Sequence, residues 1–195
     1  MKTNIPESLI RDLREKDKTF FVAVESELSA ADTLYPVIHT GMGKMNMYSA
    51  LVRWWDSARC TVDPDRHVII NLGSAGAARH EIGTVLRVNT FVNGGCELIH
   101  DVIRLGQPGE PEVSIVSGDR FVSCQTMDPV EVHRLSAQYD LFDMEAYACA
   151  RFCKERGLRM ECFKGVSDNL DGTVKEWSRI LKDLHKGFAN LAAML

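Results

Sequence analysis

The fold is decided by the stretch His67-Val-Ile-Ile-Asn-Leu-Gly-Ser-Ala-Gly76. Its apolar beginning predicts a buried strand over 67–71 that runs into a glycine-containing loop. A strand that is apolar at consecutive positions is covered on both faces, as in the parallel sheets of α/β proteins. The glycines allow a ligand to approach the backbone closely, although a purely structural turn has the same pattern. The stretch therefore predicts both a sheet and a candidate site at its edge.

Short apolar runs alternate with helical spacings on both sides of this stretch. We expect strands at 19–24, 36–40, 67–71, 85–92, 113–116, 140–143 and 159–166, and helices at 6–16, 44–58, 129–137, 146–156 and 174–194. This alternation predicts an α/β fold with a central, mixed and mostly parallel twisted sheet flanked by helices. The polar turn at 106–111 is too short to divide domains, so we expect residues 1–195 to form a single domain.

Composition excludes several classes of protein. The chain has 195 residues, of which 45% are hydrophobic and 26% charged, an ordinary globular composition. Its net charge of −4 disfavours a nucleic-acid-binding surface, which needs a basic excess. No apolar run approaches the ~18–20 residues of a membrane-spanning helix, and the charged N-terminal segment does not resemble a signal peptide. We therefore expect a cytoplasmic protein that binds neither nucleic acid nor membrane.

Cysteines and histidines do not form a metal-binding pattern. No two of the six cysteines have CxxC spacing, and the six histidines are scattered. Cys149 and Cys153 share one face of a predicted helix, where two buried thiols are expected and a metal pair is the alternative. In a cytoplasmic protein the thiols are expected to be free. We expect no metal and no organic cofactor.

Polar side chains follow one predicted strand after another, at the edge where open α/β sheets bind ligands. They include Glu25, Glu27, Lys44, Ser74, Glu145, Ser167 and Asp168, and the aromatic ring of Phe121 follows the strand expected at 113–116. Three of these carboxylates (Glu27, Glu145 and Asp168), two glycine turns and an aromatic ring at one edge predict a small-molecule site. Each has a structural alternative: Glu145 can stabilise a helix N-terminus, Phe121 can belong to the core, and Asp168 can form an ordinary turn. The turn at 41–43 has neither the GxGxxG pattern nor the GxxxxGK[ST] pattern.

Four segments, taken in order, carry a resemblance to a known family. They are Thr40-Gly-Met-Gly-Lys-Met-Asn46, Val68-Ile-Ile-Asn-Leu-Gly-Ser-Ala-Gly76, Ile115-Val-Ser-Gly-Asp-Arg-Phe121, and the pair Asp143-Met-Glu-Ala146 and Gly165-Val-Ser-Asp168. They resemble the SGIGK, VIINTGSAGG, IVSGDxF, MEA and AISD motifs of the nucleoside phosphorylase/nucleosidase superfamily. Within it, the chain is most similar to the 5′-methylthioadenosine/S-adenosylhomocysteine nucleosidases.

The resemblance implies a purine nucleoside hydrolase. Such an enzyme cleaves the N-glycosidic bond of methylthioadenosine, adenosylhomocysteine or a related nucleoside and releases the free base and the sugar. By resemblance, Asp168 is the acid that protonates the purine at N7. Glu27 activates the water, and it is preferred over Glu25 by alignment alone. Glu145 holds the ribose 2′- and 3′-hydroxyls. The pKa of Asp168 must then be raised, and we expect burial and the nearby Glu145 to raise it.

The remaining site residues are also implied by the resemblance. Met144 packs against the sugar, Phe121 stacks on the base, the backbone of Val122 reads the edge of the base, and Ser167 orients Asp168. The nucleophile pocket is lined by Ser74, Ala75, Gly76 and Lys164. Lys164 replaces a family arginine, so it keeps the charge but loses the planar fork. A loop phenylalanine that closes the purine pocket in the family falls in a shortened region here, 173–177, which contains Trp177.

Two alternatives stay open beside the hydrolase. A phosphorylase would use phosphate in place of water, but related phosphorylases carry an arginine where this chain has Asn71. A non-catalytic nucleoside-binding protein would not need all three carboxylates. The resemblance also implies a homodimer. The helix at 44–58, with Trp54 and Trp55, is a candidate dimer face, and core packing of Trp55 is the alternative.

Overall fold

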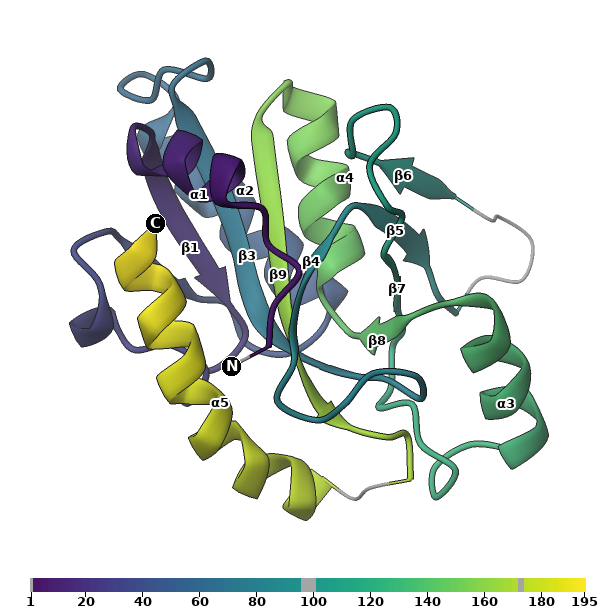
Figure 1. The fold of residues 1–195 in the computed structure, drawn as a ribbon. Coiled ribbons are helices and arrows are strands. Elements are labelled where there is room, and N and C mark those ends of the chain that lie inside the picture. The colour runs from purple at the N-terminus through teal and green to yellow at the C-terminus, as the bar shows by residue number, and fades with distance from the viewer. Residues whose placement is uncertain (1, 96–100, 172–173) are drawn as a thin grey trace.

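The computed structural model describes residues 2–95, 101–171 and 174–195 (Figure 1). Its helices are α1 (Glu7–Arg14), the 3-10 helix η1 (Ala30–Asp32), α2 (Lys44–Ala58), α3 (Pro129–Gln138), α4 (Ala146–Arg156) and α5 (Val174–Met194). Its strands are β1 (Asp17–Val22), β2 (Val37–His39), β3 (His67–Gly76), β4 (Val85–Val88), β5 (Thr90–Asn93), β6 (Val102–Arg104), β7 (Ser114–Ser117), β8 (Leu141–Asp143) and β9 (Arg159–Asp168).

One mixed sheet organises the described part of the chain. Its main path runs in the order β2-β1-β3-β8-β7-β5-β6, and β9 pairs with both β3 and β4. The pairs β1–β2, β1–β3, β3–β9, β5–β7 and β7–β8 are parallel, whereas β3–β8, β4–β9 and β5–β6 are antiparallel. Helices flank this sheet in Figure 1. The predicted α/β fold with a mostly parallel sheet is confirmed.

Successive side chains of the central strands belong to two different core clusters, one on each face of the sheet. Phe21 and Ile69 join a buried cluster with side chains of α2 and α4. Phe20 and Ile70 join a second cluster with side chains of α1 and α5. Successive strand residues point to opposite faces, so apolar residues at consecutive positions need helices on both sides. The central strands are therefore held firmly, and their ends are fixed platforms for functional side chains.

Two predicted strands differ most from the observed ones. The strand expected at 67–71 continues to Gly76, because β9 pairs in parallel with the whole segment and places Gly165 opposite Ser74. The expected glycine loop is therefore wrong: these residues are strand. The strand expected at 85–92 is two strands, which separate at Asn89. The side-chain amide of Asn89 bonds to the backbone of Pro111 and Val113, so the chain leaves β9 there and joins β7. The short strand β6 was not predicted.

The cysteines and helix α2 pack much as expected. Cys149 and Cys153 are fully buried on one face of α4, and the cysteines of the described residues are free thiols; Cys96 lies outside these residues.

Trp54 packs edge-on against Phe21, with ring centroids 5.6 Å apart. Trp54 and Trp55 are both half-buried against the first core cluster. Core packing therefore accounts for both rings, and the dimer face on this helix stays a prediction.

Metal-binding clusters and membrane-spanning helices can be assessed for the described residues. Within the described ranges, no three side chains of His, Cys, Asp or Glu are grouped so that they could hold a metal ion. None of the helices in this part of the chain combines the length and apolar character needed to cross a membrane.

Candidate active site

Glu27 is anchored to the start of the glycine segment of β3. Its Oε1 accepts hydrogen bonds from the backbone N–H of Ser74 (2.6 Å) and from the Ser74 hydroxyl (2.7 Å). The Glu27 side chain is buried, whereas Glu25, two residues earlier, is exposed. The structure therefore places Glu27 rather than Glu25 beside Ser74.

Gly73 leaves the space that this carboxylate occupies. A Cβ on Gly73 would lie 3.1 Å from Oε1 and 3.2 Å from Oε2 of Glu27, tighter than an ordinary van der Waals contact. A side chain at residue 73 would require the carboxylate to move back by a few tenths of an ångström. This glycine therefore makes room for a carboxylate of the protein itself, whereas the sequence suggested room for a ligand.

Glu145 is bound by the turn that precedes α2. Its Oε1 accepts a 2.5 Å hydrogen bond from the backbone N–H of Gly43, and its Oε2 accepts a 3.3 Å bond from Met144 N–H. Gly41 and Gly43 have φ values of 81° and 100°, which only glycine adopts easily. The glycine turn is therefore shaped to aim an amide at Glu145.

The side chain of Glu145 does not form the hydrogen bonds that cap helix α4. The first free amide of α4, that of Ala146, donates to Asp143 Oδ2 at 2.9 Å, and the amide of Tyr147 donates to the Ser117 hydroxyl at 2.8 Å. Glu145 is at the N-cap position but forms no capping hydrogen bond with its side chain. Its carboxylate is therefore left for the site.

The surroundings of Glu145 bring the pKa of its carboxyl group close to neutral pH. Burial, together with the negative charges of Asp143 and Glu27, raises its pKa to about 7, although Lys164 and the Gly43 amide act in the opposite direction. The contribution of Glu27 indicates that the two carboxylates are near enough to interact through their charges.

A buried ion pair between Lys164 and Asp143 lies next to the candidate site. The Nζ of Lys164 lies 2.9 Å from Oδ2 of Asp143, and both side chains are almost completely buried. Burial alone would lower the pKa of Lys164, but the charge of Asp143, with smaller contributions that include Glu145 and Glu27, raises it above its ordinary value. Lys164 therefore stays charged, paired mainly with Asp143 and close to the two glutamates.

Asp168 is the last residue of β9, and it is paired in register with Gly76 at the end of β3. Its Oδ2 accepts from the Ser167 hydroxyl at 2.8 Å, and its Oδ1 accepts from the backbone N–H of Leu170 at 3.0 Å. Burial raises the pKa of Asp168, with a further contribution from Asp171, against the effect of these two hydrogen bonds. The expected rise in pKa is found, but Glu145 is not among its causes: burial is the main one.

The residues expected around the base and the sugar are accessible. Phe121, Val122 and Met144 are all half-buried. The Phe121 carbonyl accepts a 2.7 Å hydrogen bond from the Thr126 hydroxyl. Val122 packs against a third, smaller core cluster, whereas Phe121 belongs to none of the three clusters found in the described chain. The ring of Phe121 is therefore not committed to the core.

Trp177 lies beside the predicted site residues, a position that the sequence did not reveal. Its indole N–H, on α5, donates a 2.9 Å hydrogen bond to the hydroxyl of Ser74. The sequence raised Trp177 only as a possible substitute for a residue that closes the purine pocket. The structure instead places it beside Ser74 and Glu27. The two bonded residues are 103 positions apart, so no local pattern connects them.

Sheet pairing explains why these residues meet. β3 and β9 are parallel neighbours, which brings Ser74, Ala75 and Gly76 alongside the segment from Lys164 to Asp168. β8 pairs with the end of β3 and leads directly into Met144 and Glu145. The predicted nucleophile-pocket residues and the three carboxylates therefore lie around the ends of adjacent strands.

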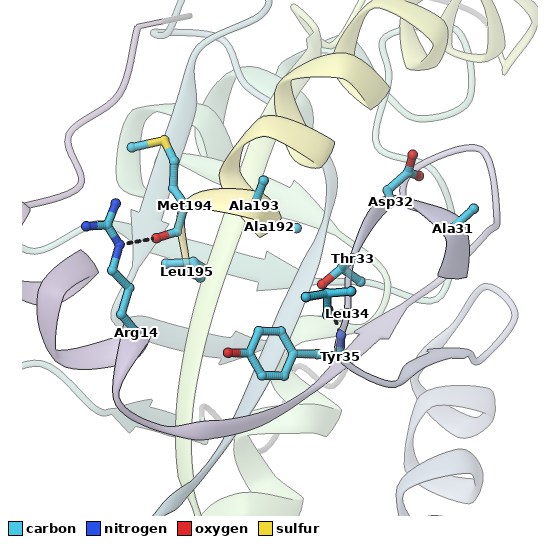
Figure 2. A pocket seen from close by; sticks show the side chains of 10 residues that line it. All are labelled: Arg14, Ala31, Asp32, Thr33, Leu34, Tyr35, Ala192, Ala193, Met194 and Leu195. Carbon is cyan, nitrogen blue, oxygen red and sulfur yellow. Dashed lines mark hydrogen bonds between the residues drawn. The ribbon is translucent and has the colours of Figure 1, made fainter.

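Two surface hollows lie away from these residues. One, of about 490 Å³, is lined by residues 31–35 and 192–195 and by Arg14 (Figure 2). In this hollow, the Nε of Arg14 donates a 2.7 Å hydrogen bond to the carbonyl of Met194. The other, of about 540 Å³, is lined by residues 158–161, by Pro6, Ser8 and Leu9, and by Arg87, Leu105, Gln107 and Glu110. Neither is lined by a predicted site residue, so chemistry and not the size of a hollow identifies the site.

Comparisons with known proteins agree with the fold. Residues 111–195 match the family model of the phosphorylase superfamily. Among solved structures, the chain is similar to a 5′-methylthioadenosine/S-adenosyl homocysteine nucleosidase of Helicobacter pylori: 15% identity, TM-score 0.73, 92% of this chain and 97% of that one. Futalosine hydrolase of the same organism has 14% identity and a TM-score of 0.74, and the match covers 93% of this chain and 97% of that one. A 5′-methylthioadenosine/S-adenosylhomocysteine nucleosidase of Neisseria meningitidis has 19% identity and a TM-score of 0.73, and the match covers 91% of this chain and 96% of that one. The predicted resemblance and fold class are confirmed.

One curated relative matches this chain in sequence over 52% of its length. The uncharacterized ABC transporter ATP-binding protein YknV of Bacillus subtilis is 33% identical over 107 residues, which are 52% of this chain and 17% of that protein. The chain thus spans about a sixth of this relative. Because the sequence has no GxxxxGK[ST] motif, the match does not point to phosphate binding by a P-loop.

Proposed function

We propose that this chain, whose fold is that of the phosphorylase superfamily, is a purine nucleoside hydrolase. The substrate would be 5′-methylthioadenosine, S-adenosylhomocysteine or a related nucleoside, and the products the free base and the sugar. The observation that carries the proposal is the contact between Ser74 and Glu27. Both donors of Ser74 point to a carboxylate, so an anionic phosphate there would lack these donors and face a like charge. A water molecule suits the same place.

Position 71 supports water as the nucleophile. The Asn71 side chain is buried, donates to the carbonyl of Phe21 at 3.1 Å, and lies 3.4 Å from the thiol of Cys162. Its polar atoms are therefore engaged within the core. They offer nothing comparable to the bidentate arginine that holds phosphate.

The two oxygens of Glu27 suit different tasks. Oε1 accepts both short bonds from Ser74, whereas Oε2 accepts only a long 3.4 Å bond from Val24 N–H. Oε2 is therefore the oxygen available to take a proton from water. In the proposed step the water oxygen forms a bond to the anomeric carbon of ribose, and its proton moves to Glu27.

Asp168 would supply the other proton. As the bond between ribose and purine breaks, its electron pair moves onto the purine, which takes a proton at N7. Burial raises the pKa of Asp168, so the carboxyl group holds its proton closer to neutral pH than an exposed aspartate. Ser167 and Leu170 fix its two oxygens. The proton taken from water and the proton given to the base balance.

Glu145 would bind the ribose hydroxyls. The carboxylate of Glu145 accepts a hydrogen bond from the Gly43 amide. Met144, like Glu145, directly follows β8. Phe121 provides a ring that belongs to none of the three core clusters of the described residues. Ribose hydroxyls that donate to Glu145 favour its charged form and lower its raised pKa, so binding and ionisation are linked. The developing positive charge on the sugar would then lie against an anion.

Base release from a panel of nucleosides tests the proposal. The panel contains methylthioadenosine, adenosylhomocysteine, adenosine, inosine and futalosine, each with and without phosphate, and chromatography measures free base and sugar. Release without phosphate supports the hydrolase, and strict dependence on phosphate identifies a phosphorylase. Binding without any release would indicate a nucleoside-binding protein. The homodimer, the cytoplasmic location and the single domain remain predictions.

A further inference from the structure

We propose that Trp177 is a positioning residue for the nucleophilic water, acting through Ser74 and Glu27. This inference rests on the proposed hydrolase function. Its basis is a continuous chain of hydrogen bonds: the indole Nε1 lies 2.9 Å from Ser74 Oγ, which lies 2.7 Å from Glu27 Oε1. Trp177 does not contact the water in this arrangement; it acts on the base that activates the water.

The direction of each hydrogen bond follows from the chemistry of the groups. An indole N–H can only donate, and a serine hydroxyl has a single hydrogen. Ser74 Oγ must therefore accept from Trp177, which leaves its one hydrogen for Glu27. Without the indole, the hydroxyl can rotate toward solvent and accept from water. Trp177 thus removes the alternative rotamers in which Ser74 would no longer donate to Glu27.

The indole itself is anchored in the core. Trp177 packs against the second core cluster, which joins α5 to β1 and β3. Farther along α5, Phe188 and Leu184 pack directly on Gly165 of β9, where a Cβ would lie 2.7 Å and 2.9 Å from their side chains. The helix is therefore seated on the strand that also carries Lys164 and Asp168. A hydrogen bond from such a helix holds Ser74 at a defined place.

The hydrogen bond from Trp177 to Ser74 also affects how Oε2 of Glu27 is oriented. With Oε1 held by the amide and the oriented hydroxyl of Ser74, the carboxylate has one orientation, and Oε2 faces the water consistently. Loss of the indole bond should reduce the fraction of productive orientations without removing a substrate contact. We therefore expect an effect on kcat of about tenfold, the size of one hydrogen bond, and little effect on KM.

A comparison of two tryptophan variants tests the inference. Trp177→Phe keeps an aromatic ring and removes the N–H, and Trp55→Phe is the matched control in the other core cluster. We expect Trp177→Phe to lower kcat about tenfold with KM within about twofold, and Trp55→Phe to leave both near wild type. In a Ser74→Ala background, Trp177→Phe should lower kcat by less than about twofold further, because the relay is already broken. An equal loss in both backgrounds would show packing alone and overturn the inference.

A second measurement does not depend on turnover. The chain has three tryptophans, so Trp54→Phe and Trp55→Phe assign the indole N–H signal of Trp177 in nuclear magnetic resonance spectra even if Trp177→Phe does not fold. Ser74→Ala should shift this signal and speed its exchange with solvent; an unchanged signal overturns the inference. A wild-type protein that releases no base refutes the proposed function. An active wild type with a fully active, folded Trp177→Phe variant refutes only the role of Trp177.

Discussion

A Cβ atom on Gly76 would lie 2.9 Å from Oδ1 of Asp168, a distance that real Cβ atoms essentially never show. Gly76 and Asp168 are also register partners in the parallel pair of β3 and β9. The absence of a side chain at 76 therefore creates the space in which the proposed acid sits. Gly73 does the same for Glu27 three residues earlier, so one strand makes room for two carboxylates.

Gly76→Ala should therefore displace Asp168. The new methyl group would also lie 2.6 Å from a methyl group of Leu170, so the turn after β9 must move. We expect kcat to fall at least about 100-fold and the free energy of unfolding to fall by about 1–3 kcal/mol, as for an overpacked core. Base release and urea denaturation measure the two effects. Wild-type turnover in this variant would show that the position of Asp168 is not critical.

Asp168→Asn should abolish most turnover and preserve the fold. An asparagine can still accept from Leu170 N–H but cannot give a proton to the leaving purine, and general acid catalysis contributes roughly 10²–10⁴-fold. Single-turnover base release and thermal unfolding check this expectation. The matched control is Asp171→Asn, which changes an exposed carboxylate three residues away and should stay within a few-fold of wild type. Similar losses in both variants would argue against a specific role for Asp168.

Glu27→Gln and Glu25→Gln separate the two neighbouring glutamates. Only Glu27 is buried against Ser74, and an amide in its place cannot take a proton from water. We expect kcat to fall about 100-fold or more in Glu27→Gln and to change by less than about twofold in Glu25→Gln. Steady-state kinetics without phosphate measure both. The reverse pattern would assign water activation to Glu25 and overturn the proposed step.

Glu145 should make stability depend on pH. Its pKa is raised from 4.5 to about 7 in the folded state, so the folded protein binds this proton more tightly than the unfolded chain. The resulting stabilisation is complete below about pH 4.5 and is lost as pH rises through about 7. Denaturation of wild type and Glu145→Gln at pH 5 and pH 8 measures it. Relative to the variant, wild type should be less stable at pH 8 than at pH 5; an equal difference at both would contradict the raised pKa.

Lys164→Met should be strongly destabilising. Removal of Lys164 leaves Asp143 as a buried charge without its partner, which typically costs about 3–5 kcal/mol. Asp143→Asn in the same chain removes that charge, so the double variant should recover part of the loss, although bonds from Ser117 and Ala146 to Asp143 are weakened. Urea denaturation of the three variants tests this. A single variant as stable as wild type would show that the ion pair contributes little.

Most secondary structure could be predicted from local sequence. The helices at 44–58, 146–156 and 174–194 have the predicted limits, because apolar spacing and terminal glycines act within one element. The strand limits were less accurate. The segment 72–76 looks like a loop in sequence, yet it is strand because β9 satisfies its backbone along its whole length. Strand pairing is a long-range property that local composition does not contain.

The sequence by itself determined the fold class, the order of the strand ends, and the types of chemical group that gather there. Only the tertiary structure decided which atoms meet: Oε1 of Glu27 meets Ser74, 47 residues away, and the indole of Trp177 meets the same hydroxyl from 103 residues farther along the chain. The physical reason is that periodicity depends on near neighbours, whereas hydrogen-bond partners at a strand end are set by sheet register and helix packing. Those relations exist only once the chain has folded.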